Sequence, residues 1–323
     1  MDRKNRSTVI GAALIIFGIL AGVALAAAWL DQPGRDGPLL RLPQGGLSRP
    51  EQTQPTLAAG PAEEAVMTFS PADGGLLALR PADDCPYRPD GAQLLLQPLE
   101  WELQGDAPTV LIVHTHASES YTRQSGENYT QSADFRTLDT DYNMVALGDR
   151  LTQLLEQAGI PVLHDRSIHD YPSYNSAYSN SRRSVQQYLA DYPSIQLVLD
   201  LHRDAVLLSD GSQFAPTVTV AGEQVARLML VVGSDASGTN HPNWEENLAA
   251  AVKLQVLLEQ QAPGITRPTI LRAQRFNHDL SAGAMIVEIG AAGNTRQQAM
   301  AAVPYLARAI IALCHGATAD STS

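Results

Sequence analysis

Apolar runs of two kinds alternate along the chain from Pro108 onward. Residues 143–158 repeat leucines at helical spacing, with Leu147, Leu151 and Leu155 on one face and Gly159 as a stop signal. The same reasoning predicts further helices over residues 179–189, 244–261 and 296–314. Short apolar, β-branched runs between them predict strands over residues 110–113, 160–163, 196–201, 217–221, 227–232 and 285–289 and around Ile270.

This order of elements predicts the fold class. Strands that are apolar along their whole length are typical of sheets buried on both faces. The helices that alternate with these strands in sequence would cover the two faces. We therefore expect an α/β domain over residues 108–315, with a mainly parallel or mixed twisted sheet and helices on both faces.

The N-terminal part of the chain has a different pattern. Residues 9–30 carry no charged side chain and are long enough to cross a bilayer as a helix. Arg3, Lys4 and Arg6 precede this run, so residues 1–8 are expected in the cytoplasm and the remainder outside the membrane. A cleaved signal peptide is the alternative, but the apolar run is long for one.

The segments around the domain are less regular. Residues 31–65, rich in Pro, Gly, Gln and Ala, are expected to be a flexible linker, residues 66–107 an approach segment, and residues 316–323 a disordered tail. The two cysteines, Cys85 and Cys314, could form a disulfide in an exported protein or remain independent thiols.

Charge excludes one class of partner. The 323 residues include 22 Lys and Arg against 34 Asp and Glu, a formal net charge of −12. Because nucleic-acid affinity depends on neutralising phosphates, a nucleic-acid partner is not expected.

Candidate chemistry begins where the strand at 110–113 ends. His116 and Glu119 follow it with H-x-x-E spacing, and a turn there could bring both side chains to one point. His114 would share a face with His116 if the strand stayed extended. Either both histidines reach a metal site, or one is a ligand and the other supports it.

A second apolar strand ends at His202. Asp200 and Asp204 flank this histidine, and either could orient its imidazole by accepting the distal N–H. Arg203 is a candidate for an anionic substrate group or a developing oxyanion. Two histidines and a carboxylate are the ligand types of catalytic zinc.

A third strand places Glu288 among apolar residues, where a carboxylate is costly to bury unless it is paired or functional. Beside a metal site it could act as the general base. The stretch 169–178 is rich in Tyr, Asn and Ser and could form a rim for a polar glycan or peptide. Its candidate substrate-binding residues, with the arginine that follows, are Tyr174, Asn175, Tyr178 and Arg182.

Several motifs, in order, resemble the stage II sporulation protein P family, the membrane-anchored peptidoglycan hydrolases of endospore-forming bacteria. They are HTHASESY (114–121), HDYPSYNSAYSNSR (169–182), DLHRDA (200–205), VVGS and HPNWEEN (within 231–247), FNHDL (276–280) and VEIGAAGNT (287–295). Together they cover most of residues 108–313.

The resemblance implies a zinc N-acetylmuramoyl-L-alanine amidase with a second, endopeptidase activity on peptide cross-links. It implies that His116 and His202 bind zinc and that Glu288 is catalytic. Glu119 is the expected third ligand, with Asp141 as its rival because related amidases take a glutamate from the start of the following helix.

The resemblance also implies a setting for the protein. The expected partner is a lytic transglycosylase of the stage II sporulation protein D type, together with membrane partner proteins. The expected location is a single-pass membrane position, with the catalytic domain between mother cell and forespore during engulfment. Two alternatives remain: a zinc carboxypeptidase acting on stem peptides, and an inactive wall-binding scaffold.

Overall fold

A computed structural model describes residues 67–69, 77–99, 101, 103 and 106–314 of the chain. The expected anchor at 9–30, linker at 31–65 and tail at 316–323 lie outside the described residues. The expected domain at 108–315 is described up to Cys314.

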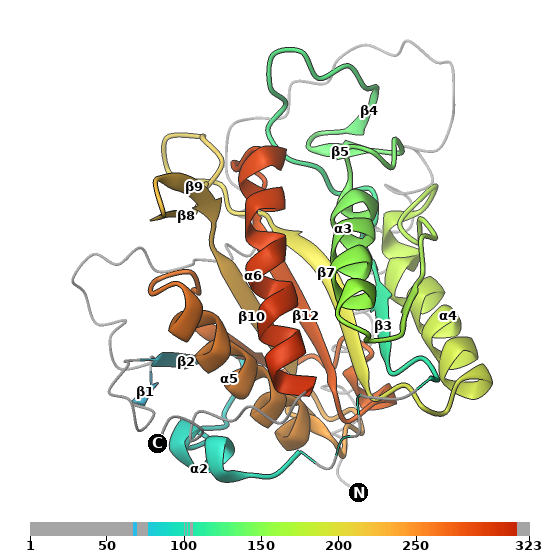
Figure 1. Ribbon diagram of the computed structural model, residues 1–323, viewed down its shortest axis with the longest axis vertical. Helices are drawn as coiled ribbons and strands as arrows, with labels where there is room; N and C mark the ends of the chain where they lie inside the picture. The colour runs from blue at the N-terminus through green and yellow to red at the C-terminus, as the bar shows by residue number, and fades with distance from the viewer. Residues whose placement is uncertain (1–66, 70–76, 100, 102, 104–105, 315–323) are drawn as a thin grey trace, which may run out of the picture. The chain divides into compact units, whose positions relative to one another are not determined.

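An eight-stranded mixed sheet forms the centre of the domain (Figure 1). Its order is β1 (Met67–Phe69), β2 (Leu77–Pro81), β11 (Thr269–Arg272), β10 (Leu228–Gly233), β12 (Ala284–Ala291), β7 (Leu197–Asp204), β3 (Val110–Val113) and β6 (Val162–His164). Strands β12, β7, β3 and β6 are mutually parallel, whereas β10 is antiparallel to β12. The predicted mixed sheet is confirmed.

The antiparallel step follows from the way the chain returns after β7. A parallel neighbour needs a long crossover connection, usually a helix. Here the chain passes instead through a hairpin of β8 (Thr217–Val220) and β9 (Glu223–Ala226) before it enters β10. Of this hairpin, only the first strand was predicted.

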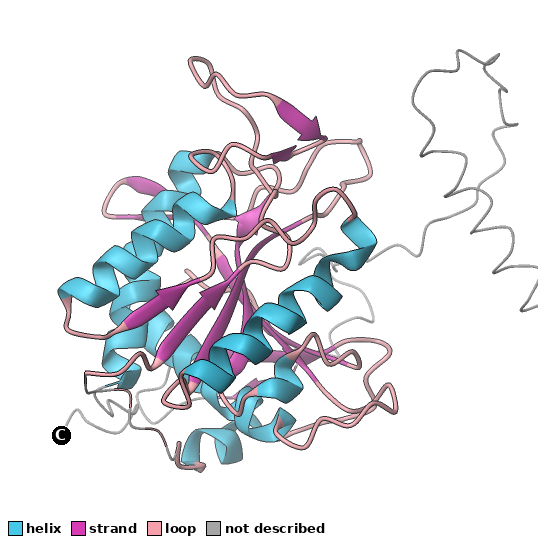
Figure 2. Ribbon diagram, turned by 90° about the vertical axis from the view of Figure 1, so that its right-hand side faces the viewer, coloured by secondary structure: helices cyan, strands magenta, loops and turns pink. Residues whose placement is uncertain are grey.

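Helices cover both faces of the sheet, as predicted (Figures 1 and 2). On one face α3 (Met144–Gln157), α5 (Trp244–Gln261) and α6 (Arg296–Cys314) share the main apolar core with Leu197, Leu199 and Leu201 of β7. On the other face α4 (Ala177–Asp191) packs through Val185 on a smaller core. The predicted bounds of β3, α5 and α6 agree with the structure.

Residues 66–107 were expected to be an approach segment, but part of it belongs to the domain. Strand β2 pairs in parallel with β11, and β1 pairs with β2 as the edge strand of the sheet. Between β2 and β3 lies the short helix α2 (Gly91–Leu96), capped at its N-terminus by Asp90, whose side chain accepts the N–H of Ala92. The sheet therefore begins before residue 108.

The two cysteines are both free: Cys85 is buried and Cys314 partly buried. Among the described helices, α6 is long and apolar enough to cross a membrane by length and composition. Its side chains Ala302, Val303 and Leu306 are buried in the main core, which is the position of a core helix.

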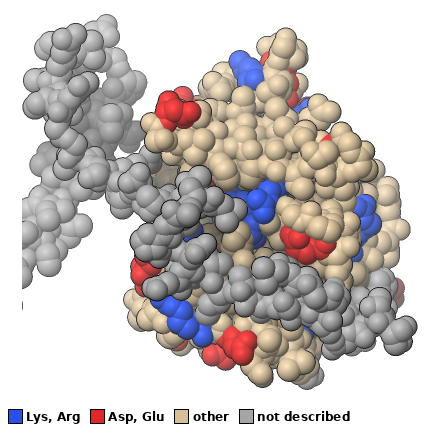
Figure 3. Space-filling view, turned by 90° about the vertical axis from the view of Figure 1, so that its left-hand side faces the viewer, with Lys and Arg blue, Asp and Glu red and all other residues tan. Residues whose placement is uncertain are grey.

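Figure 3 shows one face of the molecule, on which charged side chains of both signs are visible. A patch of basic side chains lies near the centre of this face, and further basic and acidic side chains lie around it. The described part of this face therefore presents charges of both signs.

Candidate active site

The candidate site lies on the α4 side of the sheet, where β7 and β12 run in parallel. In β7, Leu199 and Leu201 point into the main core, so Asp200 and His202 point the other way. The prediction ended this strand at residue 201, but it continues to Asp204. Glu288 of β12 is the register partner of His202. Alternation along β12 also turns Glu288 away from the main core, because Val287 and Ile289 belong to it.

A turn after β3 brings in the second group of side chains. The strand ends at Val113, and residues 115–118 form a turn that carries His116 and Glu119 toward β7. The backbone of Glu119 forms an isolated antiparallel bridge with Arg136, in the hairpin of β4 (Gln131–Ala133) and β5 (Arg136–Thr137). A hairpin farther along the chain thus holds the H-x-x-E turn in place.

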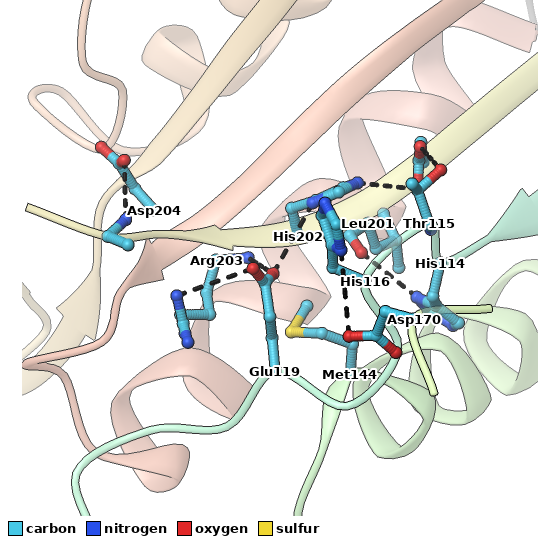
Figure 4. A network of polar contacts seen from close by, with 12 residues as sticks. His114, Thr115, His116, Glu119, Met144, Asp170, Leu201, His202, Arg203 and Asp204 are labelled. Carbon is cyan, nitrogen blue, oxygen red and sulfur yellow. Dashed lines mark hydrogen bonds and ion pairs between the residues drawn. The ribbon is translucent and has the colours of Figure 1, made fainter. Parts of the chain in front are cut away.

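His116, Glu119 and His202 lie together (Figure 4). The His116 and His202 rings meet edge to face with their centroids 5.3 Å apart. The Nδ1 atom of His202 lies 3.6 Å from Oε2 of Glu119. All three residues are buried. The structure therefore brings the three expected ligands into one cluster.

The position of His114 differs from the one expected for an extended strand. Its Nδ1 lies 3.3 Å from the carbonyl oxygen of Leu201, and its Nε2 lies 2.7 Å from Nε2 of His164. His164 in turn contacts Asp149 of α3. Because β3 stops before His114, the two-residue alternation no longer applies, and His114 and His116 separate. His114 supports the strands on the α3 side.

Two aspartates stand behind the cluster. Asp200 Oδ1 lies 2.9 Å from Nε2 of His202 and accepts the backbone N–H of Thr115 at 2.7 Å. Asp170 Oδ2 lies 3.8 Å from Nδ1 of His116. Each histidine therefore faces a carboxylate that can orient it electrostatically.

These surroundings move the histidine pKa values apart. Burial lowers the pKa of His116 to about 4, against the attraction of Glu119. Burial opposes the charge of His202 as well, but Asp200 and Glu119 outweigh it and raise its pKa to about 10. In the metal-free protein, a protonated His202 thus balances the carboxylates around it.

Glu288 has an unusual environment for a carboxylate. The residue is partly exposed, but its Oε2 atom is inaccessible and makes no hydrogen bond. Burial, together with the nearby charge of Asp204, raises the pKa of Glu288 to about 8 despite the opposing charge of His202. A carboxylate with a raised pKa beside His202 is a candidate proton carrier.

The cluster can be tested for its fit to zinc. Among the described residues, no group of three or more His, Cys, Asp or Glu side chains is already arranged to hold a metal ion. The pairwise geometry is nevertheless suitable. Two ligand atoms about 2.1 Å from a tetrahedral ion are about 3.4 Å apart, close to the 3.6 Å between His202 and Glu119. His116 Nδ1 is buried without a hydrogen-bond partner. The donor types and the distance from His202 to Glu119 fit zinc.

Two other predicted residues have surroundings that differ from those expected. The guanidinium of Arg203 is buried, donates to the backbone carbonyls of Ser120 and Phe135, and lies 3.6 Å from Glu119. Arg203 therefore braces the Glu119 turn, and its role at an oxyanion stays a prediction. Asp141, the rival of Glu119 for the third ligand position, is exposed, and its backbone N–H donates to the side chain of Asp139.

The predicted binding rim is split. Tyr174 is 54% exposed and stacks on His116 with ring centroids 4.4 Å apart, and Tyr178 meets the same imidazole edge-on. Asn175 is exposed next to Tyr174. Arg182 instead forms a two-pronged ion pair with Asp279, at 2.8 and 2.7 Å. The tyrosines thus lie at the site, while Arg182 holds α4 to the segment before β12.

Sequence reasoning missed Arg136 and Asp170. Arg136 bridges Asp170 and Glu119, and its guanidinium carbon lies 4.7 Å from the centre of the Tyr174 ring. Asp170 belongs to the HDYPSY stretch, where an acid next to a histidine could have been singled out. The sequence around Arg136 does not mark it as a site residue, because its neighbours are the ordinary polar residues of a hairpin.

The chain is similar to known proteins in sequence and in structure. The family model described as Stage II sporulation protein P (SpoIIP) matches residues 51–311. The Stage II sporulation protein P of Bacillus subtilis (strain 168) is 29% identical over 208 residues, which make up 60% of this chain and 48% of that protein. The match thus spans about half the length of this relative.

Solved structures give more distant similarities. The N-acetylmuramoyl-L-alanine amidase AmiC2 of Nostoc punctiforme is 13% identical with a TM-score of 0.39, over 65% of this chain and 99% of that one. The CwlD amidase of Clostridioides difficile, solved in complex with the GerS lipoprotein, is 12% identical with a TM-score of 0.39, over 64% and 95%. Similarity at this level assigns neither a bond nor a metal.

The family assignment therefore rests on the sequence match. The family model covers most of the chain and includes every motif of the resemblance, from HTHASESY to VEIGAAGNT. The chain belongs to the stage II sporulation protein P family.

Proposed function

We propose that this protein is a zinc-dependent peptidoglycan hydrolase that cleaves the amide between N-acetylmuramic acid and the L-alanine of the stem peptide. The observation that carries the proposal is the cluster of His116, Glu119 and His202 beside Glu288, whose Oε2 has no hydrogen-bond partner. Membership of a sporulation family supports septal wall remodelling during engulfment as the setting.

The ligands would be His116, Glu119 and His202. When bound, zinc supplies a Lewis acid that polarises the amide carbonyl and makes a water molecule more acidic. Asp200 and Asp170, at 2.9 and 3.8 Å from the imidazoles, would orient them electrostatically. Because ligating imidazoles are neutral, His202 must lose its extra proton before it can bind the ion.

Glu288 would carry the proton during hydrolysis. It takes a proton from the attacking water and returns it to the departing amine of L-alanine. A divalent cation nearby would lower the pKa of Glu288 from its metal-free value and keep the carboxylate ionised for the first transfer. Tyr174, exposed and stacked on His116, is positioned to contact a sugar or peptide of the substrate.

Two other functions use some of the same residues. A zinc carboxypeptidase on stem peptides would need the same ligands, and a wall-binding scaffold would need none of them. Glu288 favours an enzyme over a scaffold, because an unpaired carboxylate in a strand costs stability without serving binding. Cleavage of peptide cross-links, a stage II sporulation protein D-type partner and a single-pass membrane location remain part of the proposal.

Mass spectrometry of muropeptides tests the proposal. Purified sacculi are incubated with the full-length protein and zinc, and the soluble products are analysed. An amidase releases stem peptides with a free L-alanine amine and leaves bare glycan strands. Shortened stems that stay attached to glycan would indicate the carboxypeptidase instead. Unchanged sacculi in the presence of bound zinc would contradict both enzymes.

A further inference from the structure

Arg136 is an arginine from a separate hairpin that contacts both carboxylates around His116. Its NH1 lies 2.7 Å from Oδ2 of Asp170, and its NH2 lies 3.3 Å from Oε1 of Glu119. The side chain of Asp170 is fully buried, and that of Arg136 is 18% exposed. Arg136 lies in β5 of the two-stranded sheet β4–β5, which is separate from the central sheet and which Figure 1 shows above α3.

Asp170 and Glu119 differ in which of their carboxylate oxygens already have hydrogen-bond or ion-pair partners. Asp170 Oδ2 accepts the hydroxyl of Ser118 at 2.6 Å as well as Arg136, and Oδ1 accepts the N–H of Ser118 at 3.2 Å. The Oε1 atom of Glu119 contacts the guanidinium groups of Arg136 and Arg203. Its Oε2 atom lies 3.6 Å from Nδ1 of His202 and accepts the backbone N–H of Arg203. Arg136 thus neutralises Asp170 and turns one oxygen of Glu119 toward the cluster.

We propose that Arg136 is a positioning residue that selects Glu119 as the carboxylate ligand and keeps Asp170 out of the metal site. The inference rests on the proposed function and deepens it. Asp170 stands only 3.8 Å from His116, so without its arginine it would be a buried, uncompensated carboxylate beside the metal. Catalytic zinc keeps one position open for water and substrate, and a second carboxylate would close it.

The positioning role predicts a combination of zinc binding and hydrolysis that an unfolded variant would not show. In Arg136→Ala the ion should still bind, because Asp170 becomes an additional ligand, while hydrolysis falls by about 10–100-fold. In the double variant Arg136→Ala, Asp170→Asn the competing carboxylate is gone, and hydrolysis should recover about tenfold over the single variant. A merely structural arginine would lose zinc and activity together, and the second substitution would not restore either.

The experiment measures bound zinc per chain, zinc affinity by competition with a chelating dye, and hydrolysis of purified sacculi. It compares the wild type, Arg136→Ala, Asp170→Asn and the double variant. Arg123→Ala is the matched control, because Arg123 is an exposed arginine in the same segment between β3 and α3 and stacks on Tyr129, 4.2 Å from its ring centre. The control should behave as the wild type, and thermal unfolding checks that each variant is folded.

The results separate the positioning role from the proposed function. Zinc near one per chain with low hydrolysis in Arg136→Ala, and recovery in the double variant, support the positioning role. Wild-type hydrolysis in Arg136→Ala, or a loss of zinc that Asp170→Asn does not reverse, overturns that role and leaves the proposed function intact. A wild-type protein that binds no zinc or cleaves no wall contradicts both.

Discussion

Glu288 and His202 are register partners on the parallel strands β12 and β7, and both side chains turn away from the main core. This pairing fixes the distance between a candidate base and a candidate ligand by backbone hydrogen bonds rather than by a flexible loop. A site built on strands can hold its side chains more precisely than one built on loops.

Replacing Glu288 by Gln should abolish proton transfer and leave the metal in place. Glutamine is nearly isosteric and still forms hydrogen bonds, but it cannot accept the proton. General acid–base catalysis contributes about 10²–10⁴-fold, so hydrolysis should fall by at least that range. Zinc content and sacculus hydrolysis are measured on the same sample. Loss of zinc would make Glu288 a ligand, and unchanged hydrolysis would make it structural.

The same substitution should change how stability depends on pH in the metal-free protein. The pKa of Glu288 is about 8 in the folded chain, above its ordinary value of 4.5. Between these two pH values, Glu288 is ionised in the unfolded chain but stays protonated in the folded chain. The free energy of unfolding of the wild type therefore falls as pH rises. Relative to Glu288→Gln, the loss should approach about 1.4 kcal/mol per unit of pKa difference.

Chemical denaturation at a series of pH values, with a chelator present, measures this loss. The difference between wild type and variant should be small near pH 4 and grow until about pH 8, where it levels off. A constant difference across this window would show that the buried carboxylate has an ordinary pKa.

Removing the ring of Tyr174 should weaken substrate binding more than turnover. The ring stacks on His116 and is half exposed, so it can contact both the site and a bound sugar or peptide. Aromatic stacking contributes about 0.5–1.5 kcal/mol, which corresponds to an increase of roughly 2–10-fold in KM for Tyr174→Ala. Tyr174→Phe keeps the ring and should keep KM.

Tyr192→Ala provides the control for Tyr174, because Tyr192 is 39% exposed at the end of α4 and takes no part in the candidate site. Kinetics on a soluble muropeptide, with zinc content measured in parallel, distinguish the outcomes. A fall in kcat with unchanged KM would assign Tyr174 to the chemistry and contradict a binding role.

Gly148 of α3 should tolerate no side chain. A Cβ at this position would lie 2.4 Å from Nε2 of His164 and 2.6 Å from Nε2 of His114. Overpacking of this kind costs about 1–3 kcal/mol, so Gly148→Ala should unfold at a lower temperature. Gln153→Ala, on the exposed side of the same helix, is the control. Equal melting temperatures for both variants would mean that the histidine pair can move aside.

The sequence predicted the elements better than the site. Helices α5 and α6 and strand β3 have apolar patterns that end at clear polar or glycine residues, so their bounds could be read directly. Strand β7 was predicted to end at residue 201, because His202 and Arg203 beyond it are polar although both are buried in the sheet. Local pattern carries no information about burial that is produced by tertiary pairing.

The proximity of His116, Glu119 and His202 was predicted because each follows an apolar strand, and parallel strand ends meet at one edge of a sheet. The separation of His114 from His116 was not foreseen, because it depends on β3 ending at Val113. Arg136 and Asp170 reach the site through the hairpin and the loop before α4. Such long-range placements follow from the packed fold and leave no periodic signal in the chain.

The central claim is that His116, Glu119 and His202 hold one metal ion beside Glu288. It is tested most directly by an anomalous difference map, collected at the zinc absorption edge from a crystal of the zinc-loaded protein. We predict a single peak within about 2.0–2.2 Å of one donor atom from each of these three residues, with Glu288 outside this ligand set. A peak elsewhere, or one bound by Asp141 or His114 in place of Glu119 or His116, would contradict the claim.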